Sequence, residues 1–315
     1  VQKLINMKHF INLKDIPAKD LKRIIADAKK RKYLRKKLNT LEIDKGAPLK
    51  GKMLIQMFEK ASSRTRISFY LAIKQLGGGT LTLRSNELHL GQGGESISDT
   101  AKILSTYGDG FMLRTDSDEK IESFRDHLSI PVINGLSPSS HPTQVLSDVF
   151  TVEELKKKPI SKLNICWIGD SNNVLDSLIA ASVKFSFKLS IGCPKKFEPG
   201  KKVRAWVKRN KKKLFIYNDP KKAISGADVI FSDKVISLND RVNKKKKIEQ
   251  FKNFKIDKKL MSFAKRDCIF LHCLPRGREV SDEVFLGKKS HVWQQALNRV
   301  HVQKSILLYC FGKLR

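Results

Sequence analysis

The first clear pattern along the chain is a helical repeat of hydrophobic residues near the N-terminus. After Pro17, positions i, i+3, i+4 and i+7 are taken by Leu21, Ile24, Ile25 and Ala28. This spacing places the four side chains on one face of a helix. The pattern therefore predicts an amphipathic helix that begins after Pro17.

Short hydrophobic runs alternate with further helical patterns along the rest of the chain. The first half contains such runs at residues 53–58, 80–83, 110–113 and 131–133. The second half contains them at residues 164–168, 188–191, 214–217, 228–231 and 268–272. Alternating strands and helices are typical of βαβ units, whose strands form a parallel sheet. The sequence thus predicts an α/β protein in which each half has a central parallel sheet flanked by helices.

The length of 315 residues exceeds what one hydrophobic core usually organises. We therefore expect two domains, at residues 1–150 and 151–315. A helix that opens at Pro142 would join them, since Pro is favoured in the first turn of a helix. A last helical stretch, at about residues 298–309, would return to pack on the first domain.

The positive charge of the chain makes nucleic acid a candidate binding partner. Lys and Arg number 63 against 31 Asp and Glu, which gives a formal net charge of +32. Only 16 of the basic residues are Arg, and the lysines form short runs, such as residues 244–247, that we expect to be solvated. Proteins that read bases favour Arg and aromatic side chains. A nucleic-acid site is therefore less probable than a basic surface that attracts anionic substrates.

Two further observations bear on location and metals. No hydrophobic run approaches the ~20 residues needed to cross a bilayer, and the N-terminal residues lack the core of a signal peptide, so we expect a cytoplasmic protein without a membrane partner. The odd number of cysteines, without paired metal-ligand spacing, favours reduced thiols over disulfides or zinc. These cysteines are Cys166, Cys193, Cys268, Cys273 and Cys310.

A polar turn connects the strand at residues 53–58 to the helical pattern that follows it. This turn contains Ser62, Ser63, Arg64, Thr65 and Arg66. Hydroxyl groups and free backbone N–H groups at a helix N-terminus, together with an arginine, suit a phosphate dianion. The same residues could form a plain helix start, because serine and threonine are common N-caps.

Two later segments distinguish these interpretations. Arg114 ends a predicted strand, and His141, Pro142, Thr143 and Gln144 open the predicted bridging helix. Ligands of α/β proteins bind beyond the carboxyl ends of the strands. In order and spacing, the Ser-x-Arg-Thr-Arg turn, Arg114 and the His-Pro-x-Gln segment resemble the aspartate and ornithine carbamoyltransferase family. The resemblance covers essentially the whole chain.

The second half resembles the ornithine branch of this family. Residues 271–275 match its His-Cys-Leu-Pro loop, residues 169–173 its Gly-Asp-x-Asn-Asn turn, and residues 232–237 its acceptor loop. A diamino acid needs an anion for its α-ammonium group, which Asp233 can supply. Its carboxylate needs amide or hydroxyl donors, which Asn173 and Ser237 can supply.

The resemblance implies a set of roles. Carbamoyl phosphate would bind to Ser62, Ser63, Arg64, Thr65, Arg114, His141 and Gln144, with His89 contributed by a neighbouring subunit of a homotrimer. Ornithine would bind to Asn173, Asp233, Ser237, Leu238, Cys273 and Leu274. The catalytic residues would be Arg114, His141, Cys273 and Arg299. The products would be citrulline and phosphate, and no metal or organic cofactor would be required, because the chemistry involves neither redox change nor an electron sink.

The chain departs from the family pattern in its acceptor half. Residues 234–239 lack the glycine of the usual acceptor loop, Gln295 stands in a segment where acidic residues are usual, and residues 276–279 are about one residue short. Alternatives therefore stay open. The acceptor could be putrescine, an acylated ornithine or aspartate, or the chain could be a weakly active basic subunit that binds nucleic acid or serves assembly.

Overall fold

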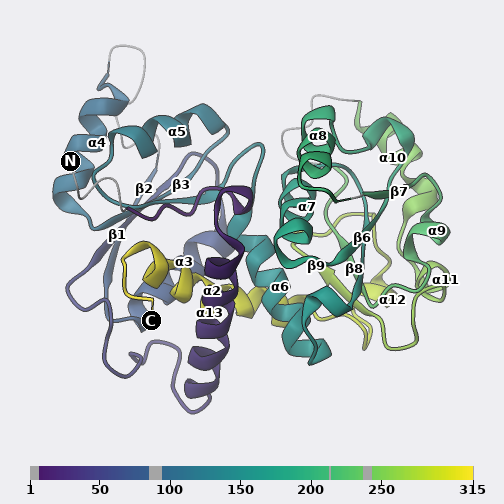
Figure 1. Ribbon diagram of the computed structural model, residues 1–315, viewed down its shortest axis with the longest axis horizontal. Helices are drawn as coiled ribbons and strands as arrows, with labels where there is room; N and C mark the ends of the chain where they lie inside the picture. The colour runs from purple at the N-terminus through teal and green to yellow at the C-terminus, as the bar shows by residue number, and fades with distance from the viewer. Residues whose placement is uncertain (1–6, 85–93, 213, 237–242, 315) are drawn as a thin grey trace. The chain divides into compact units, whose positions relative to one another are not determined.

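The computed structural model describes residues 7–84, 94–212, 214–236 and 243–314. The chain divides into two compact units (Figure 1). The first unit is Val1–Phe150 together with Leu297–Arg315, and the second is Thr151–Ala296. The boundaries between them in sequence fall within two helices, α6 (Pro142–Lys156) and α13 (Val292–Cys310).

The first unit has a four-stranded parallel sheet. Its strand order is β2 (Gly79–Arg84), β1 (Met53–Phe58), β3 (Gly110–Arg114) and β4 (Val132–Leu136). Strands β1, β3 and β4 consist almost entirely of buried residues, as expected where helices cover both faces of a parallel sheet. The helices of this unit include η1 (Leu13–Asp15), α2 (Ala18–Leu34), α3 (Ser63–Gln75), α4 (Ile97–Tyr107) and α5 (Asp118–His127).

The second unit has a five-stranded parallel sheet. Its strand order is β7 (Phe215–Tyr217), β6 (Lys188–Gly192), β5 (Asn164–Ile168), β8 (Val229–Ser232) and β9 (Ile269–His272). Its longer helices are α7 (Asn173–Phe185), α8 (Lys201–Arg209) and α10 (Lys244–Gln250). Its short helices are η3 (Ile160–Lys162), η4 (Lys195–Phe197), α9 (Pro220–Ile224), η5 (Lys252–Phe254), α11 (Lys258–Met261) and α12 (Asp282–Phe285).

The α/β class, with a parallel sheet flanked by helices in each half, is thereby confirmed. The helix expected after Pro17 is α2, and Leu21, Ile24, Ile25 and Ala28 are all buried in it. The strand expected at residues 131–133 instead runs from Val132 to Leu136. Gly135 permits this continuation, because a Cβ atom there would lie 2.4 Å from the sulfur of Met112 on the neighbouring strand.

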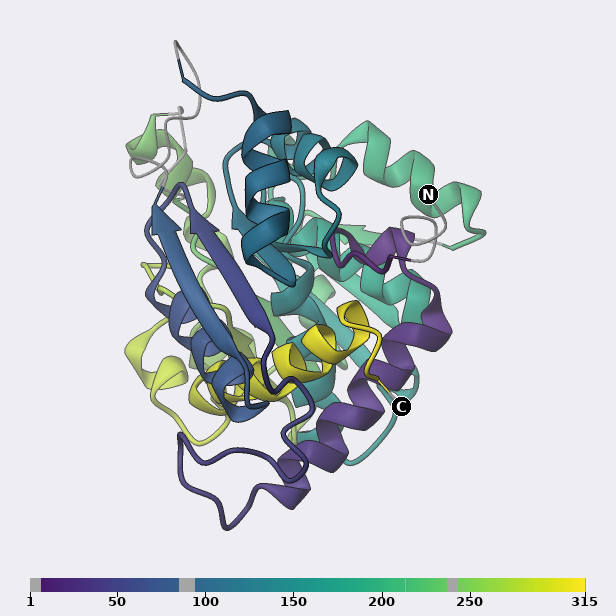
Figure 2. The ribbon, with the colours of Figure 1, turned by 90° about the vertical axis from the view of Figure 1, so that its left-hand side faces the viewer.

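The C-terminal helix begins earlier than the sequence predicts. The expected range was about residues 298–309, whereas α13 begins at Val292. Its first turns contain Gln294 and Gln295, which break the hydrophobic pattern although Gln295 is buried. Beyond residue 296, α13 lies beside α2 (yellow and purple in Figure 2), with Ser305 donating to Asp27 at 2.6 Å.

The lysine run at residues 244–247 also differs from expectation. Lys244, Lys245 and Lys246 are exposed, but Lys247 is buried with 3% of its side chain accessible. The expectation that the whole run is solvated is therefore wrong for Lys247. The run forms helix α10, and a helix that packs on a domain turns one of every three or four positions inward.

Candidate active site

The turn between β1 and α3 begins the site in the first unit. Ser62 is the N-cap of α3, and its hydroxyl accepts a hydrogen bond from the backbone N–H of Thr65 at 3.4 Å. Ser63, Arg64 and Thr65 form the first turn of the helix, where Ser63 is exposed, Arg64 half-buried and Thr65 buried. Backbone N–H groups and the positive end of the helix dipole therefore meet at this turn.

Ser62 and Ser63 also line a cavity of about 460 Å³ beside the turn. Arg66 and Arg84 contribute positive charge to the lining of this cavity, and Glu59, which also lines it, is paired with Lys120. The turn therefore combines hydroxyl groups with arginines, which is the donor set that a phosphate group prefers.

Thr65 connects this turn to two arginines that are distant in sequence. Its hydroxyl accepts hydrogen bonds from Arg299 Nη2 at 2.9 Å and from Arg114 Nη1 at 3.4 Å. Arg299 Nη1 also donates to Gln144 Oε1 at 2.9 Å. Gln144 in turn donates through Nε2 to the buried carboxylate of Asp148 at 2.8 Å. Side chains of α3, β3, α6 and α13 thus meet in one buried cluster of the first unit, which we call the arginine cluster (Thr65, Arg114, His141, Gln144 and Arg299).

Charge is concentrated in the arginine cluster. Burial, and then the positive charge of Arg64, lower the pKa of Arg114 to about 10, so Arg114 stays protonated at neutral pH. The pKa of His141 lies well below its ordinary value, mainly because the ring is buried and then because Arg299, Arg114 and Arg64 are close. His141 is consequently neutral at physiological pH. A neutral imidazole among arginines leaves the positive charge available for a bound anion.

Contacts within the first unit hold Arg299 in this place. Lys32 Nζ donates to Asn298 Oδ1 at 2.7 Å, which connects α2 to the residue before Arg299. Five residues after Arg299 on α13, the ammonium group of the fully buried Lys304 lies 2.8 Å from Asp44 Oδ2. Arg35 Nη1 also forms an ion pair with Asp44, at 2.6 Å from its Oδ1. These buried ion pairs fix the position of α13 along its axis, and so the point at which Arg299 enters the cluster.

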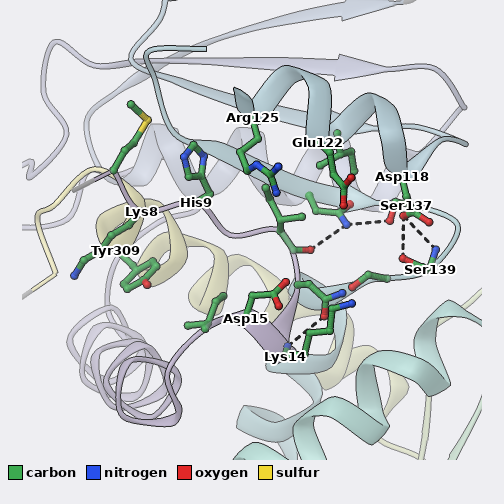
Figure 3. Close-up of a pocket in the computed structure, with 17 residues that line it drawn as sticks. Lys8, His9, Lys14, Asp15, Asp118, Glu122, Arg125, Ser137, Ser139 and Tyr309 are labelled. Carbon is green, nitrogen blue, oxygen red and sulfur yellow. Dashed lines mark hydrogen bonds between the residues drawn. The ribbon is translucent and has the colours of Figure 1, made fainter. Parts of the chain in front are cut away.

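Another pocket of the first unit offers a useful contrast. It is a cavity of about 350 Å³ between the N-terminal segment, α5 and the loop after β4 (Figure 3). Lys14 and Arg125 line it together with Asp15, Asp118 and Glu122. Because its carboxylates offset its cations, this pocket lacks the excess of positive charge that favours a phosphate dianion.

In the second unit, two adjacent strand ends carry the predicted acceptor residues. Asp233 follows β8 directly, and Asn173 is the first residue of α7, which follows β5. Asn172 connects them: its Nδ2 donates to Asp233 Oδ2 at 2.8 Å, and its Oδ1 accepts the backbone N–H groups of Val174 and Leu175, both at 3.0 Å. A half-buried carboxylate and a helix N-terminus therefore lie side by side. This pair can receive both charged ends of an amino acid.

The loop after β9 carries the half-buried Cys273 and Leu274. The backbone N–H of Leu274 donates to His272 Nδ1 at 3.0 Å, so the ring proton is on Nε2, which lies 3.1 Å from Glu279 Oε1. Burial raises the pKa of Glu279, but hydrogen bonds from His272 and from the Gly277 backbone outweigh it and hold the pKa below the ordinary value. His272 and Glu279 thus accept hydrogen bonds from the loop backbone, at Leu274 and Gly277 respectively, and hold the loop in place.

Sequence reasoning found most of these side chains but missed several that support them. The motifs indicated Asn173, yet the contact with Asp233 is made by Asn172. Glu279 and Gln295 stood out only as parts of segments that depart from the family pattern, although Gln295 Oε1 accepts the backbone N–H of His272 at 2.9 Å. Asp148, four residues after Gln144 and so on the same face of α6, could have been found by helical spacing.

Some predicted residues and groups cannot be placed. His89, Ser237 and Leu238 lie outside the described residues. Among the residues that are described, no three His, Cys, Asp or Glu side chains are arranged to hold a metal ion. No helix in the described ranges is long and apolar enough to span a membrane.

Comparison with known families gives two matches that together cover most of the chain. Residues 8–154 match the carbamoyl-P binding domain of aspartate/ornithine carbamoyltransferases. Residues 161–310 match the Asp/Orn binding domain of the same enzymes.

Individual proteins agree with these matches. The chain is 40% identical to an ornithine carbamoyltransferase of Agrobacterium fabrum, over 97% of this chain and 98% of that protein. It is 41% identical to one of Rhodopseudomonas palustris, over 97% of each chain. Among solved structures, an ornithine carbamoyltransferase from Pyrococcus furiosus is similar with a TM-score of 0.89, 37% identity and coverage of 97% of both chains. An anabolic ornithine carbamoyltransferase from Campylobacter jejuni is similar with a TM-score of 0.87 and 35% identity, and the match covers 98% of this chain and 100% of that one.

Proposed function

Because this chain belongs to the aspartate/ornithine carbamoyltransferase family, we propose that it transfers the carbamoyl group of carbamoyl phosphate to the δ-amine of L-ornithine, forming L-citrulline and phosphate. The observation that carries the proposal is the arginine cluster, in which Arg114 and Arg299 converge on Thr65 beside a neutral His141. Such a cluster suits an anion that also presents a polarisable carbonyl group.

In this proposal the phosphate group of carbamoyl phosphate binds at the N-terminus of α3. Ser62, Ser63 and Thr65 offer hydroxyl and backbone donors there. Arg64 and Arg114 supply the charge, and the positive charge of Arg64 contributes, after burial, to the lowered pKa of Arg114. The buried Nε of Arg114 has no hydrogen-bond partner among the described residues, as expected of a donor intended for a ligand.

The carbamoyl group would lie against the remaining side chains of the cluster. Arg299, Arg114 and His141 donate to the carbonyl oxygen, where negative charge develops as the amine attacks. Gln144 Oε1, which accepts a hydrogen bond from Arg299, can accept instead from the carbamoyl NH₂. Donors that are already fixed in a buried site lose little energy in reorganising, so they stabilise the transition state more than the ground state.

Ornithine would bind to the second unit. Asp233 receives its α-ammonium group, and Asn173, with Ser237 and Leu238, receives its carboxylate end. The loop of Cys273 and Leu274 would contact ornithine from the end of β9. Asp233 supports an acceptor with an ammonium group at the end that does not react, a group that is blocked in an acylated ornithine. Putrescine keeps such an ammonium group but lacks the carboxylate, so only the carboxylate-binding residues can distinguish it from ornithine.

The reaction balances without a redox cofactor. The δ-nitrogen of ornithine forms a bond to the carbonyl carbon, and the bond from that carbon to the phosphate oxygen breaks. The amine loses a proton, and phosphate leaves with the electron pair. Carbamoyl phosphate is already an activated anhydride, so direct attack by an aligned, neutral amine suffices without a covalent enzyme intermediate.

We further propose a homotrimer in which His89 of one subunit completes the site of its neighbour. The first unit exposes large hydrophobic side chains suited to an interface. These are Ile67 and Tyr70 on α3, Leu81 on β2, and Ile103 and Tyr107 on α4. Mixing His89→Ala and Arg64→Ala chains, each nearly inactive, should restore part of the activity in hybrid trimers verified by native mass spectrometry. Hybrids as inactive as their parents would show that each site is built within one chain.

A cytoplasmic location is part of the proposal. The five cysteines are all free thiols in the structure, as suits a reducing compartment. Cell fractionation tests this location directly.

The central experiment is a citrulline assay with a panel of acceptors. The purified chain is incubated with carbamoyl phosphate and, separately, with ornithine, putrescine, acetylornithine or aspartate. We expect carbamoylated product and phosphate in equal amounts with ornithine, and much less product with the other amines. A different preferred acceptor would reassign the substrate of the second unit, whereas phosphate release without any carbamoylated product would contradict transfer altogether.

A further inference from the structure

The lysine run of α10 contributes one buried ammonium group to the second unit. Lys247 has 3% of its side chain accessible, whereas Lys244, Lys245 and Lys246 are exposed. A lysine removed from water is unfavourable unless its charge is paired. Lys247 therefore has a role that the other lysines of the run do not share.

Its partner is the carboxylate of Asp170. Lys247 Nζ lies 2.5 Å from Asp170 Oδ2, and the Asp170 side chain is itself only 15% accessible. The ammonium group also lies 5.5 Å from the centre of the Phe197 ring, which packs against Phe251 at the end of α10. The carboxylate of Asp170 and the Phe197 ring thus lie beside a buried ammonium group, an environment in which charge pairing is strong.

Asp170 belongs to the short turn that carries the proposed acceptor residues. Its backbone carbonyl accepts the indole N–H of Trp167 at 3.1 Å, which fixes one end of the turn to β5. Two residues later, Asn172 caps α7 and donates to Asp233. Lys247 therefore holds the turn at Asp170, and a hydrogen bond from Asn172 connects the same turn to Asp233.

We propose that Lys247 is a positioning residue for the acceptor site: its ammonium group holds Asp170, and through the turn it sets the placement of Asn172, Asn173 and Asp233 for the amino-acid substrate. This inference rests on the proposed function. Lys247 touches neither substrate in this scheme. Its loss should therefore weaken acceptor binding while carbamoyl phosphate binding, which depends on the first unit, stays unchanged.

The test compares Lys247→Met with Lys246→Met in the full-length chain. The second variant removes an exposed lysine from the same helix and is the matched control. Steady-state assays give the Michaelis constant for each substrate and kcat, and thermal unfolding gives Tm. We expect the Michaelis constant for ornithine to rise about tenfold in Lys247→Met, with that for carbamoyl phosphate within twofold of the parent. Lys246→Met should match the parent in all four quantities.

A paired substitution separates positioning from simple stabilisation. In Asp170→Asn/Lys247→Met neither buried charge remains, so Tm should recover toward that of the parent, because an unpaired buried charge is what destabilises each single variant. The turn still lacks its ion pair, so the Michaelis constant for ornithine should stay raised. Lys247→Arg, which keeps the charge, should restore ornithine binding to within about threefold of the parent.

Three results would overturn the proposal. Lys247→Met could bind ornithine as well as Lys246→Met, both Michaelis constants could rise together as Tm falls, or the double variant could recover ornithine binding together with Tm. If Lys247→Met does not fold, Asp170→Asn replaces it, and an unchanged Michaelis constant for ornithine in that variant is equally decisive against the proposal. A parent chain that makes no citrulline would instead contradict the proposed function, so the two failures are distinguishable.

Discussion

In the first unit, Thr65, Gln144 and Arg299 come from three different helices and are buried together, whereas in the second unit Asn172 and Asp233 meet at the ends of two adjacent strands and stay half-buried. The first arrangement depends on many simultaneous contacts between distant parts of the chain. The second depends on a few contacts within and between short loops. Substitutions should therefore be tolerated better at the strand ends, and two of the departures from the family pattern, residues 234–239 and 276–279, lie in segments that follow β8 and β9.

This difference concerns chemistry as well as packing. In our proposal the arginine cluster binds the atoms that change charge during the reaction, while the strand ends bind the part of the acceptor that does not react. Changes in the first region should lower kcat or carbamoyl phosphate binding. Changes in the second should raise the Michaelis constant of the acceptor.

The largest effect is expected from Arg299→Met. Removing a fixed donor to the developing negative charge typically lowers kcat by about 100-fold or more. Steady-state citrulline formation measures the loss, with Arg209→Met, an exposed arginine at the end of α8, as control. A folded Arg299→Met enzyme with kcat within tenfold of the parent would remove Arg299 from the catalytic residues.

Arg64→Ala should weaken carbamoyl phosphate binding by more than about tenfold. A charge-assisted hydrogen bond contributes roughly 1.5–3 kcal/mol, and about 1.4 kcal/mol corresponds to a factor of ten. Isothermal titration calorimetry measures the affinity, and circular dichroism verifies the fold. Lys74→Ala, in the last turn of the same helix, is the control. Unchanged affinity in the folded Arg64 variant would reject the α3 turn as the phosphate site.

Asp233→Asn should raise the Michaelis constant for ornithine about tenfold and leave that for carbamoyl phosphate near the parent value. The carboxylate pairs only with the acceptor in our proposal, so the two constants should separate. Glu249→Gln, which alters a largely exposed carboxylate of the same unit, serves as control. A loss of carbamoyl phosphate binding instead would mean that Asp233 has a structural role.

The smallest effect is expected from Glu279→Gln, and it concerns the dependence of stability on pH. The pKa of Glu279 is lowered in the folded state, so its ionised form stabilises the second unit above the ordinary glutamate pKa of about 4.3. That contribution disappears as the pH falls through this value toward the lower folded pKa. Melting curves should therefore show a lower Tm for the variant at pH 7 and a difference that shrinks on acidification. A difference independent of pH would contradict an ionised Glu279.

The sequence by itself determined the α/β class, the order of the strands along the chain and the polar turn that begins α3. These features are local: alternating hydrophobic runs mark buried strands, a 3.6-residue repeat marks the buried face of α2, and the serine that caps α3 lies within three residues of the N–H group it binds. Each depends on residues close together in the chain, so a linear pattern suffices to predict it.

Only the tertiary structure decided which distant residues meet. Thr65 accepts a hydrogen bond from Arg299, 234 residues away, and no spacing in the sequence predicts that contact. Lys247 is indistinguishable from Lys246 in a run of four lysines, yet one is buried against Asp170 and the other is exposed. The pairing of buried charges depends on how strands and helices pack, because the energy of such a pair is set by its distance in space and its removal from water rather than by its separation along the chain.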